Sequence, residues 1–448
     1  MKKKHIYEIE EELLDSDASV AENQIPINFP ERENRDPNTL RLLSLFSGCG
    51  GMDIGFEGGF IAPRKSFREN SDSIAQIIDD DWILLKKNRF STIFANDILP
   101  EAEVGWTTYM SRHHHKADTY KRISLVDLVK MHNQGANIFP KHVDVVTGGF
   151  PCQDFSVAGK RKGFESHKDH EGKLRTDDVP SEESRGKLYF WMKQVIDITR
   201  PKVFVAENVK GLVSLGDVKN IIQRDFASAD GNGYIVLDPQ VLHAANYGVP
   251  EMRERVIFIG IRIDALCPEA LAALQQKDVP QMYNPYPLPT HNCTVNDNSL
   301  LPIVTTKDVL GMLPEPNEST DPAQAQYSKA KFLAHGQGQT EIKLDGLGPT
   351  IRSEHHGNIE FRRLSKEHCG KYLNELSQGK IERRLTPREC ALIQTFPPDY
   401  QFIIKGNGRS YKLSSSGAYK VIGNAVPPVL AYHIARRLED VWPLYFGE

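Results

Sequence analysis

The fold of this chain is decided by residues 40–51, which read LRLLSLFSGCGG. The segment begins as a short apolar strand and runs directly into a glycine-rich turn. Glycines in such a turn let the backbone bend tightly and let a ligand approach the N-terminus of the following helix. A dinucleotide-binding fingerprint that starts at Gly48 would need a glycine at position 53, where the chain has Asp53. The turn therefore favours an adenosine-type ligand without a pyrophosphate, and an ordinary strand–helix turn is the alternative.

Four more short apolar segments along the chain also predict strands. They read STIFANDILPEA from residue 91, HVDVVTGGFPCQ from residue 142, PKVFVAENVKGL from residue 201 and RVIFIGIR from residue 255. Helix-compatible stretches lie between them, for example at 184–199 and 218–229. Continuous apolar strands that alternate with helices are typical of an α/β domain with a mostly parallel sheet.

The rest of the chain divides into segments of different composition. Residues 1–37 predict an acidic, mobile tail, since the first 36 residues include 5 basic and 10 acidic ones. Residues 38–264 hold the α/β pattern, which inserts at 63–89 and 161–183 interrupt. Residues 265–385 lack the pattern and predict a smaller, irregular domain. Residues 386–448 are expected to form a hinge and a C-terminal segment that returns to the first domain.

Composition excludes several classes of protein. The 448 residues are 40% apolar and 25% charged, as in ordinary globular proteins, and no apolar run is long enough to span a membrane. The N-terminus lacks the apolar region of a secretory signal. The six cysteines form no CxxC pair, so we expect a reducing, cytoplasmic compartment rather than a disulfide scaffold. The histidines at 113–115 have no partner at ligand spacing, so no metal is expected.

The charge distribution allows nucleic-acid binding despite a net charge of −4. Residues 329–388 include 12 basic and 7 acidic residues, a local excess of +5. Contact with phosphates needs a basic face rather than a basic total, so the second domain is the expected site of such contacts.

Cys152 is the leading candidate for chemistry. It directly follows Pro151 at the end of the third apolar strand, and in open α/β sheets ligands bind at the carboxyl ends of the strands. Proline fixes its own φ and stiffens the presentation of the thiol. A cysteine phosphatase would need an arginine six positions later, where the chain has Ala158. The pattern favours a nucleophile, and a buried structural cysteine is the alternative.

Polar residues also stand at the ends of the neighbouring strands. Asp97 ends the second strand, where a carboxylate can bind ribose hydroxyls or cap a helix. Glu207 ends the fourth strand, and a buried carboxyl there is expected to have a raised pKa and to donate a proton or hydrogen-bond a ring nitrogen. Arg253 and Arg255 open the fifth strand two residues apart, so both point to one face, although a solvated charge cluster is the alternative.

The order of these segments resembles that of the DNA (cytosine-5) methyltransferases. The resemblance covers about residues 40–265 and 380–440. It rests on the segments FSGCGGMDIG, ANDI, GGFPCQDFS, SRGKLYF, ENVKGL, NYGVPEMRERVIFIG, RRLTPRECALIQTFPPDY and YKVIGNAVPP. It implies a Rossmann-like methyltransferase domain that uses S-adenosylmethionine, followed by a target-recognition domain at 265–385.

The resemblance also implies which residues bind the cofactor. Asp97 would hold the ribose, and Ile98 would lie against adenine, where many relatives have an aromatic residue. The other expected contacts are Phe46, Gly48, Cys49, Gly51, Gly149, Pro151, Leu188, Asn424, Ala425 and Val426. The element at 184–188, which reads SRGKL, matches the segment that follows the catalytic loop in the family.

The implied chemistry starts with addition of the Cys152 thiolate to C6 of cytosine, which activates C5 towards the methyl group. Glu207 would hydrogen-bond N3 and the exocyclic amine, Arg255 would hold O2, and Arg253 would support the site. The target base must be flipped out of the duplex. The residues expected to contact the base or the DNA are Phe150, Gln153, Ser156, Asn208, Arg352, His355, His356, Asn358, Arg362 and Arg363.

We therefore expect a sequence-specific methyltransferase that acts on double-stranded DNA as a monomer. A cognate restriction endonuclease is expected as its functional partner. An RNA cytosine-5 methyltransferase and an inactive DNA-binding protein on the same fold are the alternatives. The chain departs from the family at Glu251, where relatives usually have glutamine. The segment near Ile123 also matches the family's third cofactor-binding motif only poorly.

Overall fold

The computed structural model describes residues 38–151, 188–295, 297–335, 337–353, 359–371 and 373–447. The expected N-terminal tail and the insert at 161–183 lie outside these residues.

An eight-stranded sheet forms the centre of the molecule, in the order β10-β11-β8-β7-β1-β5-β6, with β9 paired to β11. Its strands are β1 (Leu40–Leu45), β5 (Phe90–Asp97), β6 (Tyr120–Arg122), β7 (Val145–Gly149), β8 (Val203–Val209), β9 (Tyr234–Val236), β10 (Gln240–His243) and β11 (Glu254–Arg262). The strands from β8 to β6 are parallel, whereas β11 is antiparallel to β8, β9 and β10. The predicted α/β class with a mostly parallel sheet is confirmed.

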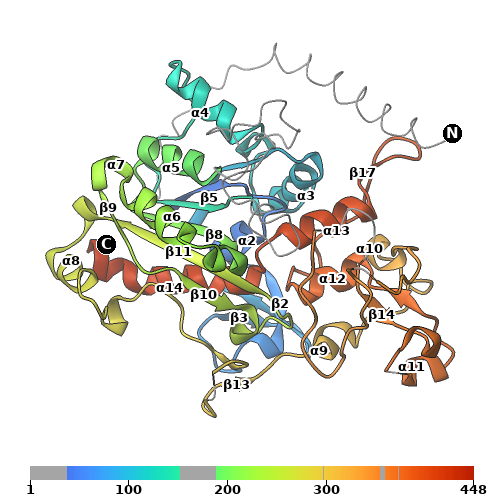
Figure 1. Ribbon diagram of the computed structural model, residues 1–448. Helices are drawn as coiled ribbons and strands as arrows, with labels where there is room; N and C mark the ends of the chain where they lie inside the picture. Colours follow the sequence, from blue (N-terminus) through green and yellow to red (C-terminus); the bar gives the residue numbers. More distant parts are fainter. Residues whose placement is uncertain are drawn as a thin grey trace.

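Helices cover both faces of this sheet, which explains why its strands are apolar throughout. Leu42 packs into one apolar core with α2 and α14, whereas its neighbour Leu43 packs into the other core with α4, α5 and α6. Figure 1 shows α4 and α5 on one side of the sheet and α14 on the other. The helices of this domain are α2 (Gly51–Glu57), α3 (Pro100–Met110), α4 (Leu125–Asn133), α5 (Leu188–Thr199), α6 (Val218–Ala227), α7 (Ala229–Asn232), α13 (Ser415–Asn424) and α14 (Pro428–Phe446).

The insert predicted at 63–89 forms a three-stranded antiparallel sheet with the residues just before it. Its strands are β2 (Ile61–Pro63), β3 (Ile74–Ile77) and β4 (Trp82–Leu85), in the order β2-β4-β3. Phe60 and Phe67 pack edge-on against Tyr432 of α14. Lys65 forms an ion pair of 2.6 Å with Asp308, so the insert also contacts the second part of the chain.

The second part of the chain is irregular, as predicted. It consists of short elements: α8 (Pro268–Leu274), β12 (His291–Asn292), β13 (Leu301–Pro302), α9 (Thr306–Leu310), α10 (Pro322–Ala325), β14 (Phe361–Arg363), α11 (Asn374–Ser377), β15 (Arg383–Arg384) and α12 (Pro387–Ile393). A hairpin of β16 (Ile404–Lys405) and β17 (Tyr411–Leu413) precedes α13. Val304, Ile351 and Leu385 belong to the same apolar core as α2 and α14, so the two parts are packed around one continuous core.

A glycine allows a close contact between α2 and α14. A methyl group built on Gly55 would lie 2.4 Å from the Ala431 methyl and 2.5 Å from the Pro428 carbonyl oxygen. Both distances are too short for carbon and oxygen atoms in contact. The helices can therefore approach this closely only with glycine at position 55.

Replacement of Gly55 by alanine is expected to force α2 and α14 apart and to lower the free energy of unfolding by about 1–3 kcal/mol. Urea denaturation of the two proteins measures the difference. The double variant Gly55→Ala, Ala431→Gly removes the nearest methyl group and should recover part of the loss. Equal stability of wild type and Gly55→Ala would contradict this account of the helix contact.

Candidate active site

A cavity opens at the carboxyl end of β1, at the edge of the sheet where ligands bind in this class of fold. It encloses about 360 Å³ of empty space, its open mouth included. Its lining comprises Ser44, Leu45, Phe46, Ser47, Gly51, Met52, Gly149, Glu207, Asn424, Ala425 and Val426. Four separate parts of the chain therefore line the cavity: residues 44–52, the end of β7, the end of β8 and residues 424–426.

The glycine-rich turn supplies the floor of the cavity. Phe46 and Gly48 have φ values of +52° and +54°, and a methyl group on Gly48 would meet no atom within 4 Å, so its surface is open to a ligand. The Gly48 N–H donates to Asp97 Oδ2 at 3.1 Å, and the Leu99 N–H donates to Asp97 Oδ1 at 3.0 Å. Burial raises the pKa of Asp97 although these N–H groups oppose the shift. The carboxylate keeps lone pairs for further donors such as hydroxyl groups.

The returning C-terminal segment closes the cavity against the start of α2. A methyl group on Gly51 would lie 2.3 Å from the Val426 carbonyl oxygen, so only glycine allows this approach. Asn424 is exposed at the end of α13 and lines the cavity together with Ala425. The structure thus brings together seven of the residues expected to meet the cofactor or the base: Phe46, Gly51, Gly149, Glu207, Asn424, Ala425 and Val426.

Other residues expected at the cofactor lie outside the lining of the cavity. Ile98 is 40% exposed beside Asp97, whereas Leu188 is buried in the core at the start of α5. The Cys49 side chain points away from the cavity, because its thiol is fully buried and lies 3.5 Å from the Val421 carbonyl oxygen in the core. Burial raises the pKa of this thiol. Pro151 is half-buried at the last described position before Cys152.

A buried carboxylate lies under the turn and was not assigned a role from sequence. Asp53 accepts hydrogen bonds from Ser44 Oγ at 2.5 Å and from Trp106 Nε1 at 2.6 Å. Burial raises its pKa to about 6. Ser44 and Ser47, which are hydrogen-bonded to each other at 2.9 Å, line the cavity directly above it. Asp53 thus holds the turn from below rather than contacting the ligand.

Glu207 and Arg255 form an ion pair of 2.7 Å beside the cavity, with side chains only 10% and 11% exposed. They are brought together by the antiparallel pairing of β8 with β11, which the sequence did not predict. Burial raises the pKa of Glu207, and Arg255 and Arg253 oppose this shift. A methyl group on Gly149 would lie 2.9 Å from Glu207 Oε2, so glycine is needed where the carboxylate approaches β7. The two side chains present a carboxyl and a guanidinium at the cavity edge.

Two residues expected to contact DNA instead position the backbone before Cys152. Phe150 packs in the core, with ring centroids 6.2 Å from Tyr189 and 6.5 Å from Phe226, which does not fit a contact with a base. Asn208 is 1% exposed, and its Nδ2 donates to the Phe150 carbonyl at 3.1 Å. Its Oδ1 accepts from the Val209 N–H at 2.9 Å. Asn208 therefore holds the end of β7 in place, and its burial does not fit the contact with DNA expected from sequence.

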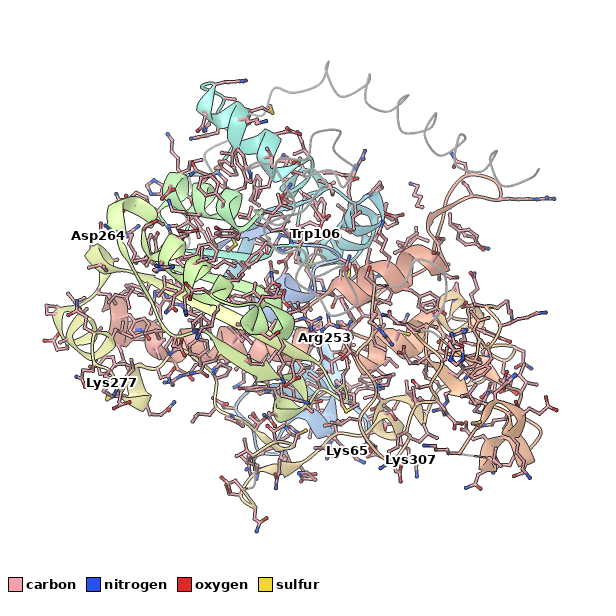
Figure 2. The ribbon with its side chains drawn as sticks, viewed as in Figure 1. Lys65, Trp106, Arg253, Asp264, Lys277 and Lys307 are labelled. Atoms are coloured by element: carbon pink, nitrogen blue, oxygen red, sulfur yellow. The ribbon has the colours of Figure 1, made fainter. Side chains whose placement is uncertain are left out.

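Arg253 is fully buried and lies between the sheet domain and the second domain (Figure 2). Its Nη1 donates to the Ile351 carbonyl at 2.9 Å, and its Nη2 donates to the carbonyls of Gly423 at 3.0 Å and Ala425 at 2.7 Å. These carbonyls flank Asn424 at the cavity. Arg253 is therefore a positioning residue.

Glu251 completes this arrangement and was recognised in the sequence only as a departure from the family. Its carboxylate accepts from the Ile351 N–H at 2.6 Å and lies 3.5 Å from Arg253 Nη1, with both side chains fully buried. Burial raises the pKa of Glu251, and Arg253 opposes the shift. We call Glu251 and Arg253 the backbone clamp, since together they bind both the N–H and the carbonyl of Ile351.

Replacement of Glu251 by alanine should lower the free energy of unfolding by about 3 kcal/mol, because it leaves Arg253 as a buried charge without its carboxylate. Glu251→Gln keeps an oxygen for the Ile351 N–H and should lose less. Denaturant unfolding of the three proteins tests this order. Equal losses in the two variants would show that the hydrogen bond to Ile351 contributes nothing.

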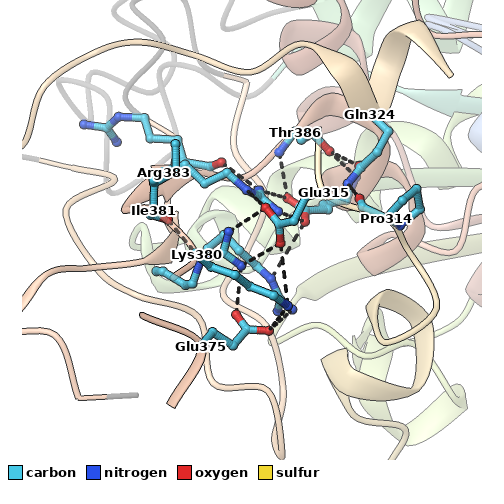
Figure 3. A network of polar contacts seen from close by, with 12 residues as sticks. Pro314, Glu315, Gln324, Glu375, Lys380, Ile381, Arg383 and Thr386 are labelled. Carbon is cyan, nitrogen blue, oxygen red and sulfur yellow. Dashed lines mark hydrogen bonds and ion pairs between the residues drawn. The ribbon is translucent and has the colours of Figure 1, made fainter. Parts of the chain in front are cut away.

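Arg362 and Arg363, which were expected to meet DNA, are buried in the second domain. Arg363 is 1% exposed and forms ion pairs with Glu315 at 2.7 Å and Glu375 at 2.9 Å, and Arg362 pairs with Glu375 at 3.1 Å. Figure 3 shows Glu315 at the centre of this network, where Arg383 also reaches it at 3.1 Å. Their burial does not fit a contact with DNA. Arg352 is 39% exposed and pairs with Glu360 beside Gly423, so it remains a candidate for contact with DNA.

The surrounding guanidinium groups outweigh burial and lower the pKa of Glu315 to about 2, from an ordinary value near 4.5. Because the folded pKa is the lower one, the network stabilises the fold above about pH 4.5 and loses this contribution as pH falls towards 2. Glu315→Gln should therefore be less stable than wild type at pH 7, and the difference should shrink at pH 3. Urea midpoints at both pH values measure it. A difference that is independent of pH would contradict the network.

Several expected site residues lie outside the described residues: Cys152, Gln153, Ser156, His355, His356 and Asn358. Among the residues that are described, no group of three metal-binding side chains occurs. No described helix is both long and apolar enough to cross a membrane.

The sheet, the cavity at its carboxyl edge and the Glu207–Arg255 pair define a methyltransferase-like enzyme. A sequence model of the C-5 cytosine-specific DNA methylases matches residues 40–440. The chain is 30% identical to the type II methyltransferase M.BsuRI of Bacillus subtilis over 98% of its own length and 88% of that protein. It is 31% identical to M.BspRI of Lysinibacillus sphaericus, with 89% and 81% covered. The chain belongs to the C-5 cytosine-specific DNA methylase family and is a DNA cytosine-5 methyltransferase.

Solved structures support the fold. A DNMT2 variant from Spodoptera frugiperda superposes with a TM-score of 0.51 at 16% identity, over 90% of this chain and 100% of that one. The Dnmt2 methyltransferase of S. pombe gives 0.50 at 16% identity, over 89% and 98%.

Proposed function

We propose that this enzyme transfers a methyl group from S-adenosylmethionine to C5 of a cytosine flipped out of double-stranded DNA, through a covalent bond between Cys152 and C6. The observation that carries the proposal is the Glu207–Arg255 pair at the rim of the cavity. It stands next to the end of β7, whose backbone continues through Pro151 into Cys152. A nucleophile, a carboxyl and a guanidinium are thus expected around one base-sized space.

The residues at the cavity fit an adenosine-type cofactor. Gly48 leaves open space beside the turn, and Asp97 next to it offers free lone pairs for ribose hydroxyls. Ile98 is exposed beside Asp97, where a flat ring can lie against it. Asn424 and Val426 would close over the other end of the cofactor. When bound, S-adenosylmethionine supplies an electrophilic methyl group.

The chain's own residues account for the activation of cytosine. C5 is a weak nucleophile, and addition of the Cys152 thiolate to C6 makes it enamine-like. Negative charge then develops towards N3, where the Glu207 carboxyl can donate a hydrogen bond or a proton. Burial raises the pKa of Glu207, so this carboxyl takes up a proton more readily than an ordinary carboxyl does. Arg255 would hold O2 and fix the ring in the plane of the carboxyl.

C5 would form a bond to the methyl group while the bond between that methyl carbon and the sulfur of the cofactor breaks, and the electron pair of that bond would leave with S-adenosylhomocysteine. C5 would then lose its proton to a base such as water. The electron pair of that C–H bond re-forms the C5–C6 double bond and expels the Cys152 thiolate, and any proton that Glu207 gave to N3 returns to its carboxylate. The products are 5-methylcytosine, S-adenosylhomocysteine and the free enzyme, with the thiolate ready for another turnover.

DNA rather than RNA is the substrate that the family match supports, and the intact Glu207–Arg255 pair argues against an inactive binding protein. A target inside a stacked duplex is out of reach of the cavity, so base flipping is part of the proposal. Relatives named as type II methyltransferases suggest that methylation protects host DNA from a cognate restriction endonuclease. We also propose that the enzyme acts as a cytoplasmic monomer.

Duplex DNA that carries 5-fluorocytosine at the target should trap the enzyme covalently, because fluorine cannot leave C5 as a proton. The trapped complex is counted by denaturing gel after incubation with S-adenosylmethionine. Cys152→Ala should form no such complex and should lose at least about 10³-fold in methyl transfer, since the addition step is removed.

The matched control is Cys49→Ala, because Cys49 is buried in the core away from the cavity. This variant should still be trapped. Trapping by Cys152→Ala, or methyl transfer into RNA but not DNA by wild type, would overturn the proposal. Bisulfite sequencing of DNA from cells that express the protein would then identify the methylated sequence.

A further inference from the structure

The hairpin between α12 and α13, residues 404–413, takes no part in the site described above. It projects from the body of the protein beyond α13 (Figure 1). Lys405, Arg409 and Lys412 are exposed on it, and none of them forms an ion pair with any residue in the described part of the chain. The chain has no acidic residue from position 401 to position 438. We call residues 404–413 the basic hairpin.

The basic hairpin is anchored firmly at its base. Leu413 is buried, and its side chain lies against Gly105 of α3 and Gly417 of α13. The Tyr411 hydroxyl accepts from Gln326 Nε2 at 3.4 Å, and Gln326 Oε1 accepts from Ser415 Oγ at 2.7 Å. The hairpin is therefore held against both the second domain and α13. The base of the segment that carries its cations therefore has a fixed position relative to α13.

Helix α13 leads from the cavity to this hairpin. Ser416, Lys420 and Asn424 are four residues apart on one face of α13, and Asn424 lines the cavity. The helix rises about 14 Å from residue 415 to residue 424. The strands of the hairpin add about 10 Å. The three cations therefore lie within about 25 Å of the cavity, which is about seven base pairs of duplex along the axis.

We propose that the basic hairpin binds the sugar–phosphate backbone of the DNA duplex outside the methylated sequence. The inference rests on the proposed function, in which duplex DNA enters at the cavity. Three cations match up to three phosphates, and such contacts add affinity without reading bases. Single-stranded nucleic acid fits less well, because its binding needs several aromatic platforms and Tyr411 is the only aromatic side chain on the hairpin.

The test is the triple variant Lys405→Ala, Arg409→Ala, Lys412→Ala, measured by fluorescence anisotropy on duplexes of two lengths. Both duplexes are centred on a site that wild type methylates, and they are about 12 and about 30 base pairs long, below and above the reach of the hairpin. On the long duplex the variant should bind about tenfold or more weakly at 0.1 M salt. The slope of log affinity against log salt should fall by about 2.7, which is about 0.9 for each lost contact. On the short duplex the difference should largely disappear.

A matched control removes three lysines far from the hairpin: Lys86, Lys219 and Lys277. This control should bind both duplexes as wild type does, and Lys405→Arg, Arg409→Lys, Lys412→Arg should restore binding because it keeps the charges. An unchanged salt slope in the alanine variant, or an equal loss on both lengths, would overturn the inference. Failure of wild type to methylate any duplex would instead overturn the proposed function. The two failures are therefore distinguishable.

Discussion

A buried ion pair, Glu251 with Arg253, holds together the parts of this protein that must act on one base. Two fully desolvated charges are costly, and they are stabilising here only because each also binds backbone groups. Through Arg253 the clamp fixes the carbonyls on both sides of Asn424 in the cavity wall. Through Ile351 it fixes the segment that leads to Arg352 in the second domain. Arg255, two positions along the chain from Arg253, then meets Glu207 at the cavity.

The sequence predicted those parts of the fold whose signal is local. The five continuous apolar segments became β1, β5, β7, β8 and β11, because a strand covered by helices on both faces has no polar side to interrupt the pattern. Strand direction is not a local property, so the antiparallel course of β11 was missed. The insert strand β3 was missed as well, since most of its residues are exposed and leave no apolar pattern.

The candidate site was predicted to a similar extent. Glu207 and Arg255 were identified from their residue types at predicted strand ends. The position of each side chain depends on where its strand ends, and the apolar pattern of the sequence predicts that. Side-chain direction decided the errors. Cys49 turns into the core and Phe150 packs under the site, although both belong to motifs that resemble the family. Arg363 was read as a free cation because its partner Glu315 lies 48 residues earlier in the chain. A count of basic residues includes arginines such as Arg363, whose charge is neutralised inside the fold. It cannot distinguish them from the exposed cations of the hairpin.

The clamp has a consequence for how this enzyme can diversify. It binds only main-chain atoms of its partners: the N–H and carbonyl of Ile351 and the carbonyls of Gly423 and Ala425. Every residue type carries that carbonyl, and all but proline carry that N–H. The side chains of the second domain that are proposed to read DNA can therefore be exchanged by mutation while the contacts that align this domain with the Glu207–Arg255 pair stay intact. Target preference is free to drift in this architecture without a matching change in the chemical machinery.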